Sequence, residues 1–134
     1  FTSIITLINE FSVFQKTPEK VTITLEQMEN DGDLFQCFVA ENDSQHIIGF
    51  ASFYFTYNSW SGKGLYLDDL YVQEIYRKHK TGSRLLNQVI DFAKSEGCKK
   101  MRWLVSRWNT DAIGFYKKMG AAIEETEIMC DLKL

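Results

Sequence analysis

The sequence predicts an α+β fold with a mixed central sheet, antiparallel in its first strands, parallel in its centre and flanked by helices. Two observations lead to this prediction. Between residues 34 and 73, three runs rich in β-branched and aromatic residues are separated by turn sequences, which is typical of an antiparallel meander. After residue 82, helical and strand patterns alternate, which is typical of parallel pairing. A chain of 134 residues suits one domain, so we expect a single domain over residues 1–134.

Two helices are predicted at the start of the chain. Residues 3–13 place isoleucine, leucine and phenylalanine side chains at the spacing of one helical face. In the second helix, residues 24–30, Thr24 and Gln27 stand three positions apart, which is the spacing of a capping box. The Asn-Asp-Gly sequence that ends at Gly32 closes this helix.

Three strands are predicted next. Residues 34–40, 47–57 and 65–73 are rich in the residue types that favour strands. Turn-forming residues lie between them, at 42–44 and at 61–64. Short turns of this kind join antiparallel neighbours, so these strands form a meander.

Helix and strand alternate in the following stretch. From Gly82 the apolar residues recur at helical spacing, and Gly97 lies where a C-cap glycine ends a helix. Residues 99–106 then predict a strand. Because a helix crosses over between them, this strand is expected to lie parallel to the strand that precedes the helix.

One more helix and one more strand complete the prediction. Asn109 or Thr110 can cap the helix, and Gly120 terminates it. Residues 121–134 alternate loosely between polar and apolar side chains, so we expect a last strand there.

Composition excludes several classes of protein. The formal charge of −3 and the sequence pI of about 5.4 mean that the whole molecule does not attract polyanions. The three cysteines lie outside any C-x-x-C spacing and the two histidines are isolated, so neither a disulfide framework nor a metal site is expected. No apolar run approaches the length of a membrane span and no secretory leader is recognisable, so we expect a soluble cytoplasmic protein.

A basic loop precedes the helix that starts near Gly82. It contains Arg77, Lys78 and Lys80, and it lies between the end of a strand and the start of a helix. Free backbone N–H groups and the positive end of the helix dipole meet at such a position, so the loop is a candidate anion site. From these residues alone, a solvated basic turn is the favoured interpretation, because basic residues in an exposed turn more often contact only water. A nucleic-acid site is less favoured because no second basic cluster or stacking platform accompanies the loop.

Three stretches resemble one family. The stretch LYLDDLYVQEIYRKHKTGSRLL, residues 65–86, resembles the acetyl-coenzyme A binding segment of the GNAT superfamily of N-acetyltransferases. Together with YFTYNSWSGKGLYLDDLYV, residues 54–72, and LVSRWNTDAIGFYKKMGA, residues 104–121, it is similar to the diamine and spermidine/spermine branch, which includes the thialysine acetyltransferases. The resemblance implies a GNAT-like three-layer fold and acetyl-CoA as the cofactor.

The resemblance also implies which residues bind the cofactor. A strand segment would pair with the pantetheine arm, the basic loop would wrap the pyrophosphate, and the start of the next helix would hold the far side of the cofactor. The corresponding residues here are Leu70, Tyr71 and Val72 in the strand, Arg77, Lys78, His79, Lys80, Thr81, Gly82 and Ser83 in the loop, and Asn109, Thr110, Asp111 and Ala112 at the helix.

Two residues match catalytic positions of the family. Tyr116 matches the tyrosine that donates a proton to the departing thiolate, and Asp68 matches an acidic residue that acts as general base, here through water because aspartate is short. Asp68 and Asp69 are adjacent in a predicted strand, so we expect them to face opposite sides of the sheet. The acceptor amine would contact Phe14, Gln15, Asp68, Arg102, Trp103 and Leu104.

The sequence departs from the family pattern at three places. Lys80 replaces a glycine of the loop, and we expect it to adopt an ordinary helical backbone conformation. Gln15 is neutral where the polyamine enzymes have an acidic residue. The sequence begins inside the first helix, whereas the superfamily opens with a short strand, so that strand either lies outside this sequence or is absent. If it is absent, a partner chain in a homodimer could cover the exposed sheet edge.

These features leave three functions open. The first is acetyl transfer from acetyl-CoA directly to a primary amine of a small diamine or polyamine-like substrate. The neutral Gln15 keeps an amino-acid or protein-lysine acetyltransferase as the first alternative, and the altered glycine pattern keeps a non-catalytic CoA-binding module as the second. A covalent enzyme intermediate is not expected, because the sequence offers no nucleophile with an identifiable partner base.

Overall fold

The computed structural model describes residues 1–134, apart from the side chain of Lys78, and comprises two compact units. The first unit is Phe1–Leu104 and the second is Val105–Leu134, and each is described by itself below.

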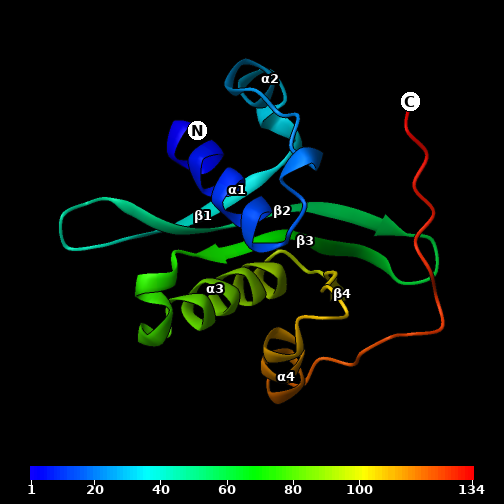
Figure 1. Cartoon of the computed structure of the whole chain (residues 1–134). Helices are drawn as coiled ribbons and strands as arrows, with labels where there is room; N and C mark the ends of the chain where they lie inside the picture. The colour runs from blue at the N-terminus through cyan, green and yellow to red at the C-terminus, as the bar shows by residue number, and fades with distance from the viewer. The chain divides into compact units, whose positions relative to one another are not determined.

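The first unit is built on a four-stranded sheet (Figure 1). Its strands, in both chain and spatial order, are β1 Gln36–Glu41, β2 Ile47–Asn58, β3 Gly62–Val72 and β4 Lys100–Arg102. The first three strands pair antiparallel, and β3 pairs with β4 in parallel. The mixed sheet predicted from the sequence is therefore confirmed.

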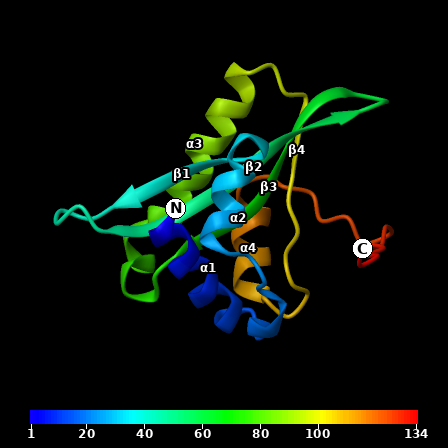
Figure 2. The same ribbon diagram turned by 90° about the horizontal axis from the view of Figure 1, so that it is seen from above.

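Helices cover both faces of this sheet. Helices α1, Thr2–Phe14, and α2, Leu25–Asn30, lie on one face, and α3, Thr81–Ser95, lies on the other, as the views in Figure 1 and Figure 2 agree. The Thr24 hydroxyl accepts the backbone N–H of Gln27 at 3.1 Å, so the predicted N-cap of α2 is present. The first unit thus has a helix-sheet-helix layering.

Short 3₁₀ helices were not predicted. They span Pro18–Lys20, Gly32–Leu34 and Glu74–His79, the last of which is η3. Each has at most two turns, too few residues for a helical periodicity to stand out in the sequence.

Each face of the sheet has its own core. On the face toward α1, here called the α1 face, Phe50 and Tyr71 pack with Ile4, Leu7 and Met28. On the opposite face, here called the α3 face, three rings from the sheet surround Phe92 of α3 at centroid distances of 5.6 to 5.9 Å; they are Phe38, Phe53 and Phe55. Alternating strand residues supply the two cores, as the period of two requires.

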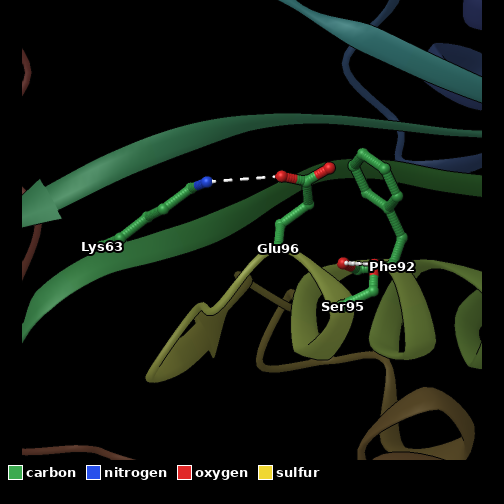
Figure 3. A network of polar contacts seen from close by, with 4 residues as sticks. All are labelled: Lys63, Phe92, Ser95 and Glu96. Atoms are coloured by element: carbon green, nitrogen blue, oxygen red, sulfur yellow. Dashed lines mark hydrogen bonds and ion pairs between the residues drawn. The ribbon is translucent and has the colours of Figure 1, made fainter.

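The end of α3 is fixed against the start of β3 (Figure 3). Lys63 Nζ lies 3.6 Å from Glu96 Oε2 and 4.4 Å from the ring centroid of Phe55. In the preceding residue, the Ser95 hydroxyl donates to the carbonyl of Phe92, three residues back in the helix, at 2.7 Å. Gly97 then adopts a φ of 77°, which ends the helix as predicted.

Two predicted boundaries in the first unit were wrong. The turn expected at residues 61–64 lies earlier, because Ser61 N–H donates to the Asn58 carbonyl and Gly62 already belongs to β3. The strand expected at 99–106 pairs only at Lys100–Arg102. A strand ends where its hydrogen-bonded pairing with the neighbouring strand ends. Strand propensity in the sequence does not show the position at which the pairing stops.

The second unit contains helix α4, Thr110–Lys118. The Asn109 side chain accepts the backbone N–H of Ala112 at 3.3 Å, so Asn109 is the N-cap. Gly120 adopts a φ of 94° after the last turn, as a terminating glycine should.

The predicted strand at 121–134 was wrong, because this segment has no ladder partner among the described residues. Its apolar side chains Ile128, Met129, Leu132 and Leu134 are exposed. Loose alternation gives a segment strand propensity, but a strand also needs an edge to pair with.

Candidate active site

A β-bulge interrupts the pairing of β2 with β3. Ser52 lies opposite Asp69, whereas the next residue of β2, Phe53, lies opposite Leu67. Asp68 is therefore an extra residue in β3 with no direct partner on β2. A bulge of this kind disturbs the regular alternation of side chains.

The bulge brings the two aspartates to the same face. Leu67 lies opposite Phe53 on the α3 face, so its neighbour Asp68 points to the α1 face. Asp69 lies opposite Ser52, which also belongs to the α1 face. The expectation that the two side chains face opposite sides was therefore wrong, because it assumed an unbroken strand.

The pKa values of both carboxyl groups are raised above their ordinary values. Burial, together with the neighbouring charge of Asp68, raises the pKa of Asp69 to about 7. Burial also raises the pKa of Asp68. Asp69 therefore keeps its proton almost to neutral pH, while Asp68 ionises first.

Two tyrosines lie near Asp68 and Asp69 on the α1 face, and the four side chains together are here called the acidic face. Tyr54 and Tyr66 lie opposite each other, with ring centroids 5.3 Å apart. Their pKa values are raised by burial first and then by nearby negative charges, including that of Asp68. Aromatic rings beside carboxylates suit an organic cation, since both attract positive charge.

One edge of β3 is open beside this acidic face. Its other edge pairs with β2 up to Val72, but β4 pairs with β3 only at Gly64, Leu65 and Tyr66. From Leu67 onward, the β4-side edge has no ladder partner among the described residues. An extended ligand can therefore add to the sheet along Leu70, Tyr71 and Val72, as the resemblance implies.

The basic loop lies directly after this open edge and comprises the end of η3, Lys80 and the first turn of α3. The first turn of α3 has the sequence Thr-Gly-Ser-Arg and contains no acidic residue, so its N–H groups and dipole favour an anion. A Cβ on Gly82 would meet only Val72 Cγ2, at 3.9 Å, so this backbone is open to a ligand. His79 and Lys80 are exposed, Thr81 and Ser83 are partly exposed, and the side chain of Lys78 lies outside the described residues.

Lys80 adopts a left-handed backbone conformation, with φ 60° and ψ 21°. The expectation of an ordinary helical conformation was wrong. Lys80 is the N-cap of α3 and its carbonyl accepts the N–H of Arg84 at 3.1 Å, so the chain must turn sharply from η3 into α3 at this residue. Such a conformation costs a non-glycine residue about 1–2 kcal/mol.

Replacing Lys80 with glycine is expected to raise the free energy of unfolding by about 1 kcal/mol, because glycine adopts a positive φ without this steric cost. Urea denaturation followed by circular dichroism measures the change. Lys80→Ala is the matched control, since it removes the charge and keeps the Cβ atom. An equal gain from alanine and glycine would show that charge, not backbone strain, causes the effect.

The predicted acceptor residues lie at the end of α1 and after β4. Phe14 is the last residue of α1, and Gln15 is its C-cap, with a backbone N–H that donates to the Phe11 carbonyl at 2.8 Å. Arg102 pairs with Tyr66 in parallel register and so shares the α1 face with Asp68. Trp103 and Leu104 follow directly, and Leu104 is exposed.

The remaining predicted residues belong to the second unit. Asn109, Thr110, Asp111 and Ala112 form the capped start of α4, where backbone N–H groups again favour an anion. Tyr116 lies later in the same helix, its ring centroid 5.5 Å from that of Phe115. Burial raises the pKa of Tyr116, so its phenol stays protonated at neutral pH, as a proton donor must.

The sequence interpretation missed four residues of the site. Asp69, Tyr54 and Tyr66 belong to the acidic face, and Glu10 contacts the end of β3. The adjacent pair Asp68-Asp69 was a usable signal, because aspartate is disfavoured in strands and two together suggest an irregularity. Nothing local marks Glu10, since its partners lie more than 60 residues away.

Within the described residues, no group of three or more His, Cys, Asp or Glu side chains is placed to hold a metal ion. None of the described helices combines the length and apolar character needed to cross a membrane.

Comparison with known proteins finds acetyltransferases that are similar to this chain in sequence. The thialysine N-epsilon-acetyltransferase of Bos taurus is 33% identical over 130 residues, covering 89% of this chain and 76% of that protein. The spermidine/spermine N(1)-acetyltransferase-like protein 1 of Homo sapiens is 36% identical over 128 residues, covering 88% of this chain but 18% of that protein.

Solved structures agree on the fold. An aminoglycoside acetyltransferase from an uncultured soil metagenomic sample, in complex with trehalose, matches with a TM-score of 0.82 at 20% identity. The match covers 99% of this chain and 89% of that one.

A family model settles the identification. The acetyltransferase (GNAT) family model matches residues 1–121. That range includes the bulged strand, the basic loop, the start of α4 and Tyr116. The chain belongs to the acetyltransferase (GNAT) family, whose members take the acetyl group from acetyl-CoA.

Proposed function

We propose that this protein transfers the acetyl group of acetyl-CoA directly to a primary amine of a small diamine or polyamine-like substrate. The observation that supports this most is the bulge at Asp68, which places two carboxylates beside the open edge of β3. An extended pantetheine arm would lie along that edge, and a cationic amine would be attracted to the acidic face next to it. The named substrates of the thialysine and polyamine relatives point to the same class of acceptor.

The cofactor fits the residues that are present. Leu70, Tyr71 and Val72 would hold the pantetheine arm by backbone hydrogen bonds. The loop Lys78–Ser83 would hold the pyrophosphate with N–H groups and positive charge. Residues Asn109–Ala112 would hold the far side of the cofactor. When bound, acetyl-CoA supplies an acetyl group on a thioester, which an unprotonated amine can attack.

Asp68 and Tyr116 would move the protons. A primary alkylamine has a pKa of about 10, like that of lysine, so it is protonated at neutral pH. Asp68 would first accept a proton from the ammonium through water, and the free amine would then attack the thioester carbonyl, so that the carbon–nitrogen bond forms and the carbon–sulfur bond breaks. Tyr116 would donate its phenolic proton to the sulfur that leaves.

Cys37 is a poor alternative nucleophile, which favours direct transfer. It lies opposite Ser52 and so shares the α1 face with Asp69. Burial, followed by the charge of Asp69, raises the pKa of this thiol to about 11. Thiols attack as thiolates, so Cys37 is unreactive near neutral pH.

A panel of acceptors tests the function. Initial rates with spermidine, putrescine, thialysine and a lysine peptide are compared at saturating acetyl-CoA, and we expect the highest kcat/KM with a small diamine or thialysine. A preference for the peptide or for free amino acids would support the first alternative. Acetyl-CoA binding by calorimetry without turnover on any amine would support a non-catalytic module. This alternative stays open because Lys80, with a positive φ, replaces a glycine of the family's loop.

Three further proposals follow from the same reasoning. The family match spans both units, which supports one acetyltransferase domain over residues 1–134. Exposed apolar side chains at Ile128, Met129 and Leu132 support a homodimer in which this segment meets a second copy, a state that sedimentation equilibrium measures.

Three free thiols support a cytoplasmic location, because disulfides are rare in that compartment. Localisation of a tagged full-length protein to a secretory compartment would contradict it.

A further inference from the structure

Arg77 is bound to the protein itself at the start of the basic loop. Its Nε donates a hydrogen bond to the Val72 carbonyl at 2.8 Å. Its guanidinium carbon lies 4.8 Å from the ring centroid of Phe14 and 5.4 Å from that of Tyr71. A planar cation that stacks on two rings and donates from Nε is held in one orientation.

The rings beneath Arg77 belong to a connected aromatic row. Phe11 lies between the other two, with its centroid 6.4 Å from Phe14 and 5.2 Å from Tyr71. Phe11 and Phe14 come from α1, whereas Tyr71 comes from β3. Arg77 therefore joins the end of α1, the end of β3 and the start of the loop.

Glu10 reinforces the same junction. Its carboxylate accepts hydrogen bonds from the Tyr71 hydroxyl at 3.2 Å and from Gln73 Nε2 at 3.3 Å. The Gln73 backbone N–H also donates to the Ile48 carbonyl at 2.9 Å. The segment between Tyr71 and Arg77 is thus fixed at both ends to other elements.

The Val72 carbonyl marks a change of direction. Val72 is the last residue of β3, and Arg77 occupies its carbonyl five residues later. A ligand that pairs with the open edge of β3 would meet the loop immediately beyond this point. The angle between edge and loop therefore depends on the contact of Arg77 with Val72.

We propose that Arg77 is a positioning residue that holds the basic loop at the angle needed for its N–H groups to meet the cofactor pyrophosphate, rather than a direct ligand of the phosphates. The proposal rests on the proposed role of the loop in acetyl-CoA binding. It assigns Phe14 to the same function, as the ring on which the guanidinium stacks.

The two roles predict different effects of charge-preserving substitution. A direct phosphate ligand acts mainly through its charge, so Arg77→Lys would bind CoA nearly as well as the wild type, and Arg77→Gln would not. A positioning residue needs the planar guanidinium and the Nε donor, so Arg77→Lys and Arg77→Gln should weaken CoA binding equally, by about tenfold.

Calorimetric titration with CoA at two salt concentrations tests the proposal. We expect Arg77→Lys and Arg77→Gln each to raise Kd about tenfold, and Arg77→Gln to do so without changing the dependence of Kd on salt, because no ion pair with phosphate has been lost. Phe14→Leu should raise Kd in the same direction, and the double variant should be no weaker than Arg77→Lys alone. In assays the KM for acetyl-CoA should rise while kcat at saturation stays within about twofold.

Lys80→Gln is the matched comparison, since Lys80 lies in the loop and its side chain is exposed. It should reduce the salt dependence of CoA binding, as the loss of a phosphate contact would. Thermal unfolding of every variant shows whether it folds. If Arg77→Lys does not fold, Phe14→Leu decides the question, because its ring is partly exposed and its loss is tolerable.

The proposal is overturned if Arg77→Lys binds CoA like the wild type, or if Phe14→Leu leaves Kd unchanged. It is also overturned if either Arg77 variant reduces the salt dependence. Failure of the wild type to bind CoA would instead refute the proposed function of the loop, and the assignment of Arg77 with it.

Discussion

A Tyr116→Phe variant is expected to lose about one to three orders of magnitude in kcat while it binds acetyl-CoA nearly as well as the wild type. The phenylalanine keeps the ring and removes the proton that Tyr116 would give to the departing thiolate. Burial raises the pKa of Tyr116, so the phenol is protonated across the neutral range and remains a donor well into alkaline pH. Steady-state kinetics with the best amine of the panel, together with calorimetry for the cofactor, measure both quantities.

Tyr57→Phe is the control for this experiment. Tyr57 lies near the end of β2 and is 82% exposed, so loss of its hydroxyl should leave kcat unchanged. Equal turnover by Tyr116→Phe and the wild type would remove Tyr116 from its proposed role. A loss of cofactor affinity as large as the loss of kcat would show instead that the tyrosine has a structural role in α4.

An Asp68→Asn variant is expected to lower kcat/KM for the amine by about a hundredfold, at the low end for general-base catalysis because the proton passes through water. Asparagine preserves shape and removes the proton acceptor. Asp43→Asn, in an exposed turn, controls for the loss of one negative charge elsewhere on the surface.

The pH dependence of this reaction has a definite sign. Asp68 accepts a proton only when ionised, and burial raises its pKa, so the rate should fall as the pH is lowered into the acidic range. Asp69 ionises at about pH 7 and then adds a second negative charge to the α1 face, so the KM for a cationic amine should decrease as the pH rises through 7.

Variants at the two aspartates separate their roles. Asp69→Asn should abolish the change in KM near pH 7 and retain the acidic fall in rate. In Asp68→Asn the pKa of Asp69 should drop, because the neighbouring charge that raises it is gone. A larger loss of kcat in Asp69→Asn than in Asp68→Asn would transfer the role of base to Asp69.

Local signals in the sequence were sufficient for most elements of the fold. The helical spacing of residues 3–13, the Thr24 cap and the terminating Gly97 all correspond to observed features. These signals depend on residues within one or two helical turns of each other, so they can be recognised without knowledge of the rest of the chain. Local signals also predict the candidate anion site at the start of α3, because a strand, a basic loop and a helix start follow one another in sequence.

The errors arose where distant segments decide the outcome. The extra residue Asp68 is set by how β2 and β3 align along their length, and a single shift moves a side chain to the other face. The strand expected at 121–134 lacked a pairing edge among the described residues. Lys80 has a left-handed backbone because η3 must turn into α3 there, although lysine has no preference for that conformation.

The sequence by itself determined the four α-helices, the order of the four paired strands and, through three stretches, the resemblance to an acetyltransferase family that the comparisons confirm. The tertiary structure alone decided that Asp68 and Asp69 share a face, and that Arg77 stacks on Phe14 instead of extending freely into the loop. The physical reason is the range of the interactions. Propensity and capping act between neighbours in the chain, whereas register, stacking and burial depend on residues brought together only when the chain has folded.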